Sequence, residues 1–321
     1  MGLTPPGRAS QIYVWDIKTG SIVKHLDLPG TLFNEVQIST NGRLVLATPY
    51  DRFLYGFDFN RAKSVEFRPE QQLGKIKNFS ISPDGHHVAI AVGSWLYIWE
   101  PESGSILAKL DIKPDRLSHG GLSFSPDGSR VVYKPVGGES YLAIRDWKLG
   151  NAAQRVKLKE TNGGLAIDPK AQIIASIERR KLSDFVRLYD FDTLKIVRDI
   201  NADEWKKTAN FYISSMAFTP DGKRFAVGTN QGNVQMFDIE TGVEIFRAKA
   251  AEFSVHQIGF TNDGKTLLTN ESDKRPKGWD VSAIPPGNLF EIACKKLPDK
   301  NLNEIDEGRL SIPEPICKEH P

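Results

Sequence analysis

The sequence SPDG occurs at residues 82–85 and again at residues 125–128. TPDG at 219–222 and TNDG at 261–264 are close variants, and STNG at 39–42 and DPKA at 168–171 fall in the same phase. The third residues of these six turns are 43, 43, 43, 51 and 42 residues apart. Asp and Gly favour tight turns, because the Asp side chain bonds nearby N–H groups and Gly tolerates a positive φ. Such regular spacing indicates an internal repeat.

Short apolar runs of alternating pattern flank each turn. EVQIS precedes and RLVLAT follows the first turn, and SSMAFT precedes and RFAVGT follows the fifth, which is typical of β-hairpins. A bulky residue followed by an acid recurs with the same period. These pairs are Trp15-Asp16, Phe57-Asp58, Trp99-Glu100, Arg145-Asp146, Tyr189-Asp190, Phe237-Asp238 and Trp279-Asp280. Since another β-rich run follows several pairs, each period predicts four strands.

These features resemble the WD-repeat β-propeller family, in which repeats of about 40–45 residues form four-stranded blades. The resemblance covers residues 11–283. It implies an all-β fold: a β-propeller of four-stranded antiparallel blades over residues 1–286, with a C-terminal extension over 287–321 packed on it. The Gly-His pair that opens many such repeats is nearly absent. We therefore expect sheet pairing and apolar burial to hold the blades together.

The number of blades follows from the two markers. Seven bulky-acid pairs accompany six turns, so one blade lacks its first hairpin. A ring of blades must close, because an open edge strand invites aggregation. Seven blades are favoured, with a tail segment such as GRLSIP (308–313) completing the last blade. Six blades or an incomplete ring are the alternatives.

The C-terminal extension differs in character from the repeats. It resembles the Cys-containing extension of many bacterial WD-repeat proteins, which implies a bacterial protein. NLFEIACKKL (288–297) has apolar residues at helical spacing and predicts a short helix. The two cysteines of the chain, Cys294 and Cys317, are predicted to be either reduced thiols or a disulfide, and a disulfide implies an oxidising compartment.

Composition limits the partners and the location. The formal net charge is +2, which argues against nucleic acid as the partner. No apolar run approaches the roughly 18–20 residues that span a bilayer, and the first residues lack the apolar core of a signal peptide. We expect a cytoplasmic protein, with the periplasm left open if the cysteines are bonded. The sequence does not predict the oligomeric state.

The chemistry of the residues does not favour an enzyme. The six histidines are scattered, and no familiar metal-binding, nucleophile or phosphate-loop motif occurs. The turn Asp residues recur once per repeat, as structural residues do. We predict no catalytic, metal or cofactor-binding residues and no cofactor. The alternative is a propeller hydrolase or dehydrogenase with a metal or cofactor on the central axis.

The irregular 51-residue interval between Lys170 and Asp221 holds the predicted partner-binding site. IERRKLSD (177–184) is interpreted as a basic loop between strands, and NADEWKKTANF (201–211) as a long loop between blades. Arg and Trp frequently anchor interfaces. The predicted site, which would bind an acidic protein or peptide, comprises Arg179, Arg180, Lys181, Trp205, Lys206 and Lys207. The alternative is a solvated charged loop with Trp205 folded against a blade.

Overall fold

The computed structural model describes residues 10–16, 19, 21–28, 33–49, 53–69, 75–112, 117–135, 140–158, 161–170, 172–180, 183–200, 211–271 and 277–282. The chain divides into two compact units, Met1–Leu165 and Ala166–Pro321, which we describe separately. Regular structure in the described residues is antiparallel β-sheet, without an α-helix. This part of the chain accordingly contains no helix able to cross a membrane.

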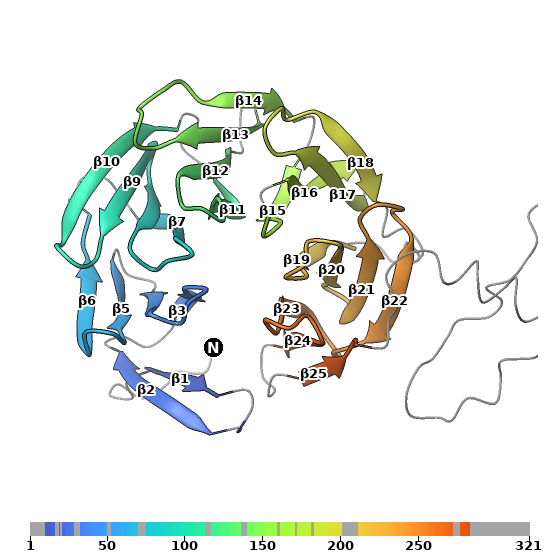
Figure 1. Cartoon of the computed structure of the whole chain (residues 1–321), viewed down its shortest axis with the longest axis horizontal. Helices are drawn as coiled ribbons and strands as arrows, with labels where there is room; N and C mark the ends of the chain where they lie inside the picture. The colour runs from blue at the N-terminus through green and yellow to red at the C-terminus, as the bar shows by residue number, and fades with distance from the viewer. Residues whose placement is uncertain are drawn as a thin grey trace, which may run out of the picture. The chain divides into compact units, whose positions relative to one another are not determined.

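The first unit holds a two-stranded sheet and three blades (Figure 1). The two-stranded sheet pairs β1 (Ser10–Trp15) with β2 (Ile22–Leu28). The first blade comprises β3 (Phe33–Ile38), β4 (Leu44–Pro49), β5 (Leu54–Asp58) and β6 (Lys63–Phe67). The second comprises β7 (Ile76–Ile81), β8 (Val88–Val92), β9 (Trp95–Glu100) and β10 (Ser105–Asp111). The third comprises β11 (Leu117–Phe124), β12 (Arg130–Pro135), β13 (Tyr141–Asp146) and β14 (Gln154–Lys157).

Three further blades follow, and the division between the units falls inside the first strand of the first of them. This blade comprises β15 (Thr161–Ile167), β16 (Ile173–Arg180), β17 (Ser183–Asp190) and β18 (Ile196–Ile200). The next comprises β19 (Ile213–Phe218), β20 (Arg224–Thr229), β21 (Asn233–Asp238) and β22 (Glu244–Lys249). The last has three described strands, β23 (Val255–Phe260), β24 (Thr266–Glu271) and β25 (Lys277–Asp280).

The strand pattern confirms the predicted four-stranded antiparallel blades, and it explains the two sequence markers. Each of the six turns joins the first two strands of a blade, and each bulky-acid pair lies at the end of β1 or of a third strand. The described residues form six blades and one two-stranded sheet, so the seventh blade that we favoured is not supported. The expected C-terminal helix is not supported either, since residues 283–321, with GRLSIP and the proposed boundary at 286, lie outside the described part.

Side-chain hydrogen bonds explain why the turn sequence recurs. In the turn at 82–85, Ser82 Oγ donates to Asp84 Oδ1 (2.5 Å), and the same carboxylate oxygen accepts the N–H of His86 (3.0 Å). Ser82 Oγ also accepts the N–H of His87 (2.9 Å). The hydroxyl and the carboxylate thus satisfy backbone donors that the turn leaves without ladder partners. The turn beginning at Asp168 differs, because its carboxylate takes the place of the hydroxyl and accepts both N–H groups itself.

The turn glycines also pack against the preceding turn. Gly85 has φ +70°, and a Cβ at this position would lie 3.1 Å from Ser39 Oγ, so Gly serves both the backbone conformation and the close approach. Asn41 Nδ2 donates to the carbonyl of Asp84 (2.7 Å), which joins the same two turns. A Cβ at Gly222 would lie as close to Asp168, at 3.1 Å, and looser contacts join Gly264 to Pro220 (3.4 Å) and Gly128 to Ser82 (3.9 Å).

Apolar side chains between neighbouring blades form the core, as expected. Leu46, Phe79 and Trp99 belong to one cluster between the first two blades, and each is at most 2% exposed. Trp99 therefore has the structural role predicted for the bulky-acid pairs. Apolar burial stabilises such contacts by about 25 cal/mol per Å².

Candidate functional site

The predicted basic loop at 177–184 is mostly regular strand. β16 and β17 pair up to Arg180 and Ser183, which leaves residues 181–182 as the connection, so the interpretation of the whole stretch as a loop was wrong. Arg179 Nε donates to Asp184 Oδ1 (2.8 Å), and the Asp184 side chain is fully buried. The second oxygen of Asp184 accepts the N–H of Ile213 (3.2 Å). Arg179 therefore compensates a buried carboxylate, although a third of its side chain is exposed.

The other predicted site residues are not brought together by the described structure. The backbone of Arg180 lies in β16. Its side chain is outside the described part, as are Lys181, Trp205, Lys206, Lys207, Cys294 and Cys317. The basic patch and the disulfide therefore stay predictions.

A polar cluster occupies the other face of the same hairpin. Tyr189 donates its hydroxyl to Glu178 Oε1 (2.5 Å), and Arg187 Nη1 donates to Glu178 Oε2 (3.1 Å). Arg187 also makes two bonds to Asp199, at 2.6 and 2.7 Å. Burial, together with the hydrogen bond to Glu178, raises the pKa of Tyr189, so this phenol stays protonated. Each charged group in the cluster has an oppositely charged partner, which indicates a structural role.

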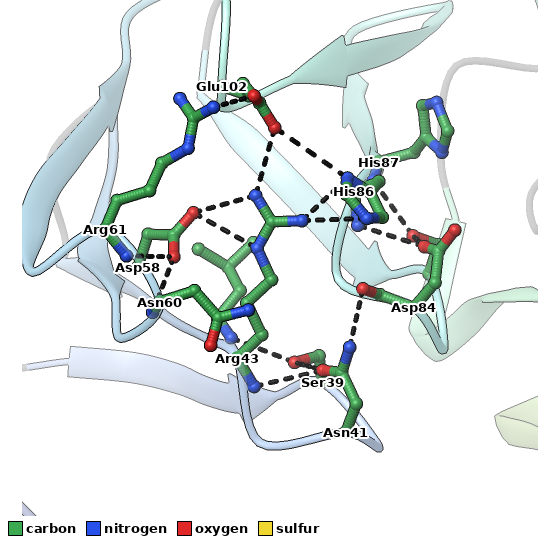
Figure 2. Close-up of polar contacts among 12 residues, drawn as sticks. Ser39, Asn41, Arg43, Asp58, Asn60, Arg61, Asp84, His86, His87 and Glu102 are labelled. Carbon is green, nitrogen blue, oxygen red and sulfur yellow. Dashed lines mark hydrogen bonds and ion pairs between the residues drawn. The ribbon is translucent and has the colours of Figure 1, made fainter.

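A second cluster, the inter-blade cluster, joins the first two blades of the first unit (Figure 2). It comprises Arg43, Asp58, Arg61, His86 and Glu102. Arg43 is central: its Nε and Nη2 donate to Asp58 Oδ2 (3.2 and 3.0 Å), and Nη2 also donates to Glu102 Oε2 (3.2 Å). Its Nη1 lies 2.6 Å from Nδ1 of His86, and Arg61 pairs with Glu102. The cluster connects turns of both blades at the end where the SPDG-type turns lie.

Burial and hydrogen bonding compete at Asp58. Burial alone would raise the pKa of this carboxyl group, but hydrogen bonds from Arg43 and from the N–H groups of Arg61 and Asn60 outweigh it. The pKa of Asp58 consequently lies below its ordinary value, and the carboxylate is ionised at neutral pH.

The acids of the bulky-acid pairs cap the turns that follow them. Asp58 Oδ1 accepts the N–H groups of Asn60 and Arg61 (3.0 and 3.2 Å). Asp146, Asp190, Asp238 and Asp280 accept backbone N–H groups in the same manner. These bonds give the acids of the bulky-acid pairs a structural role, which was predicted from the sequence only for the Asp residues of the SPDG-type turns.

Sequence reasoning missed two exposed aromatic residues in the second unit. Phe253 is 67% exposed and Tyr212 is 42% exposed. Both lie just before the first strand of a blade, at the end of the blades opposite the SPDG-type turns. The sequence gives only their positions in connections between blades, and their exposure becomes visible in the structure.

Comparison with known proteins agrees with this architecture. A family model for the WD40 domain of anaphase-promoting complex subunit 4 matches residues 192–263. WD repeat-containing protein 1 from Gallus gallus is 23% identical over 224 residues, which are 67% of this chain and 35% of that protein. The chain is a WD-repeat protein.

Other similarities extend over most of this WD-repeat protein. Pre-mRNA-processing factor 19 from Dictyostelium discoideum is 22% identical over 242 residues, which are 72% of this chain and 45% of the relative. A chain of the solved Kuenenia stuttgartiensis hydrazine synthase has a TM-score of 0.71 and 14% identity, covering 86% of this chain and 90% of that chain. At that identity the likeness concerns the fold alone. The WD-repeat chain spans about a third of WD repeat-containing protein 1 and under half of pre-mRNA-processing factor 19.

Proposed function

We propose that this WD-repeat protein is a non-catalytic scaffold that binds other proteins through loops at one end of its blades. The observation that carries the proposal is the contrast between the two ends of the blades. At one end, the turns repeat the same hydrogen bonds and pack against each other. At the other end, the connections vary: residues 158–160 join β14 to β15, whereas residues 201–212 join β18 to β19. Variable loops on a rigid sheet are the common location of binding residues.

The acids support a scaffold over the enzyme alternative. The Asp residues that end the third strands accept backbone hydrogen bonds from the turns that follow, and Glu178 and Asp184 are paired with arginines. Carboxylates used in this manner are structural residues. The solved hydrazine synthase is an enzyme by its name, but its 14% identity carries no activity to this chain.

The proposed binding patch retains the predicted residues, with one change in their roles. Arg180, Lys181, Trp205, Lys206 and Lys207 are proposed to contact an acidic protein segment. Arg179 is better regarded as a support, because its guanidinium is bonded to the buried carboxylate of Asp184. We further propose a cytoplasmic and bacterial protein, in keeping with the sequence predictions.

Capture of partners from a native lysate tests the scaffold. The immobilised chain should retain one protein in stoichiometric amount, and the variant Arg180→Glu/Lys181→Glu/Trp205→Ser should lose it without a change in thermal stability. Arg179 is left intact so that Asp184 stays paired. Failure of the wild-type chain to retain any protein, together with turnover of a small molecule, would favour the enzyme.

A further inference from the structure

Two exposed aromatic side chains lie at the same end of neighbouring blades in the second unit. Tyr212 directly precedes β19, and Phe253 lies two residues before β23. The hydroxyls of Ser214 and Ser215 both donate to the carbonyl of Val255, at 2.7 and 2.9 Å. The beginnings of β19 and β23 are therefore in contact, as their positions in Figure 1 also show.

The backbone below Phe253 is held by the loop of the preceding blade. The N–H groups of Ala250 and Ala251 donate to the carbonyl of Gly232, at 2.8 and 2.9 Å. Gly232 has φ +78°, and a Cβ there would lie 2.0 Å from the oxygen of Ala251 and 2.5 Å from that of Phe253. Because any side chain at Gly232 would displace this loop, Phe253 is presented from a closely packed backbone.

Tyr212 is fixed by the same connection between β20 and β21. The N–H of Asn230 donates to the carbonyl of Tyr212 (3.1 Å), and the N–H of Tyr212 donates to Asn230 Oδ1 (3.0 Å). Both aromatic residues thus stand on backbone that is already ordered, which lowers the entropic cost of binding.

Two lysines at strand ends, Lys249 in β22 and Lys277 in β25, place positive charge beside these loops. Lys249 Nζ donates to the carbonyl of Gln231, and Lys277 Nζ donates to the carbonyl of Ala250 (2.7 Å). Both lysines are exposed. An ammonium group has three N–H donors, so a single carbonyl bond leaves capacity for a carboxylate. Glu252 is an acid in the loop before β23. The two lysines and Glu252 together still carry a net positive charge.

We propose that Tyr212, Phe253, Lys249 and Lys277, here called the aromatic–lysine surface, bind an acidic peptide segment of a partner protein. An apolar side chain of the segment packs against the two rings, and its carboxylates pair with the two lysines. This assignment rests on the proposed scaffold function and adds a second surface for the acidic partner class proposed there. Aromatic anchors beside complementary charge are the usual composition of a binding hot spot.

Selection from a phage library of random short peptides tests the surface directly. The wild-type chain should enrich acidic peptides with a central aliphatic or aromatic residue. Binding of a fluorescein-labelled enriched peptide should weaken about 30-fold in Phe253→Ser, the loss expected for one hot-spot aromatic. Lys249→Gln/Lys277→Gln should weaken it about tenfold, less at high salt.

A matched control is Leu149→Ser, which removes an apolar side chain that is 69% exposed and lies in the first unit. Leu149→Ser should leave peptide binding unchanged. If Phe253→Ser is poorly folded, Phe253→Leu replaces it and should retain most of the binding. No enrichment, enrichment of basic peptides, or equal binding by Phe253→Ser would overturn the assignment. If the lysate partner binds Phe253→Ser as well as wild type, the scaffold function stands and this surface is wrong. If the wild-type chain retains no lysate protein, the scaffold function fails and the peptide titration decides the surface.

Discussion

Replacing Arg43 with methionine should destabilise the first unit more than any surface change. The side chains of Arg43 and Asp58 are only 7% and 3% exposed, and the guanidinium makes bonds of 3.0 and 3.2 Å to one carboxylate oxygen. Removing one partner of a buried ion pair costs about 3–5 kcal/mol, because the other charge stays buried. The N–H groups of Asn60 and Arg61 still bond Asp58, so we expect the lower value, about 3 kcal/mol. This corresponds to a fall in Tm of roughly 6–12 °C.

The loss should depend on pH. In the wild type the pKa of Asp58 is lowered, so its contribution to stability is present above the ordinary carboxyl pKa and is lost as the pH falls through the folded value. In Arg43→Met the guanidinium is absent, so burial raises the pKa of Asp58 above its value in the wild type. The difference in unfolding free energy between the two chains should therefore be largest near neutral pH and shrink as the pH falls below about 4.

Urea denaturation at several pH values measures this difference. Arg43→Met/Asp58→Asn should recover to within about 1 kcal/mol of wild type, since no charge then stays buried. Arg68→Met is the matched control: it breaks the pair with Glu66, in which Arg68 is 68% exposed, and should cost below about 1 kcal/mol. A loss for Arg43→Met no greater than for Arg68→Met, or one independent of pH, would refute the reasoning.

Two further substitutions test the turns. Asp127→Ala removes the carboxylate that accepts bonds from Ser125 and Ser129, and it should lower the unfolding free energy by about 1–2 kcal/mol in urea titration; an unchanged midpoint would contradict the turn chemistry. Gly232→Ala combines a positive φ with two carbonyl clashes and should cost at least about 2 kcal/mol, with weaker binding of the acidic peptide, measured by calorimetry and fluorescence anisotropy. Normal binding by a stable Gly232→Ala chain would show that this loop does not set the surface.

Much of the blade structure could be predicted because one repeat encodes it several times. A single Ser-x-Asp-Gly turn is weak evidence, but Ser82 and Thr219 begin turns with the same bonds, and both positions were identified from spacing. The positions of the first two strands and of the acid that ends the third follow from this periodicity. The prediction failed at 177–184, where basic residues suggested a loop but the strand pairing of β16 with β17 continues to Arg180.

The site was harder to predict because its contacts join residues that are distant in sequence. Asp184 is 29 residues from Ile213, whose N–H it accepts, and Arg43 is 59 residues from Glu102. Neither Arg179 nor Arg43 shows in the sequence that its charge is compensated. Phe253 was overlooked for the opposite reason, since an isolated aromatic residue in a connection resembles core until its exposure is known.

The contact of Gly85 with Ser39, and of Gly128 with Ser82, has an evolutionary consequence. The repeat around residues 82–85 carries both halves of the joint: Gly85 fits its predecessor, and Ser82 receives its successor. Tandem duplication of one repeat would therefore create a new junction already complementary on both sides. Such a gene could lengthen by copying alone, and selection would then be left to diversify the opposite ends of the blades.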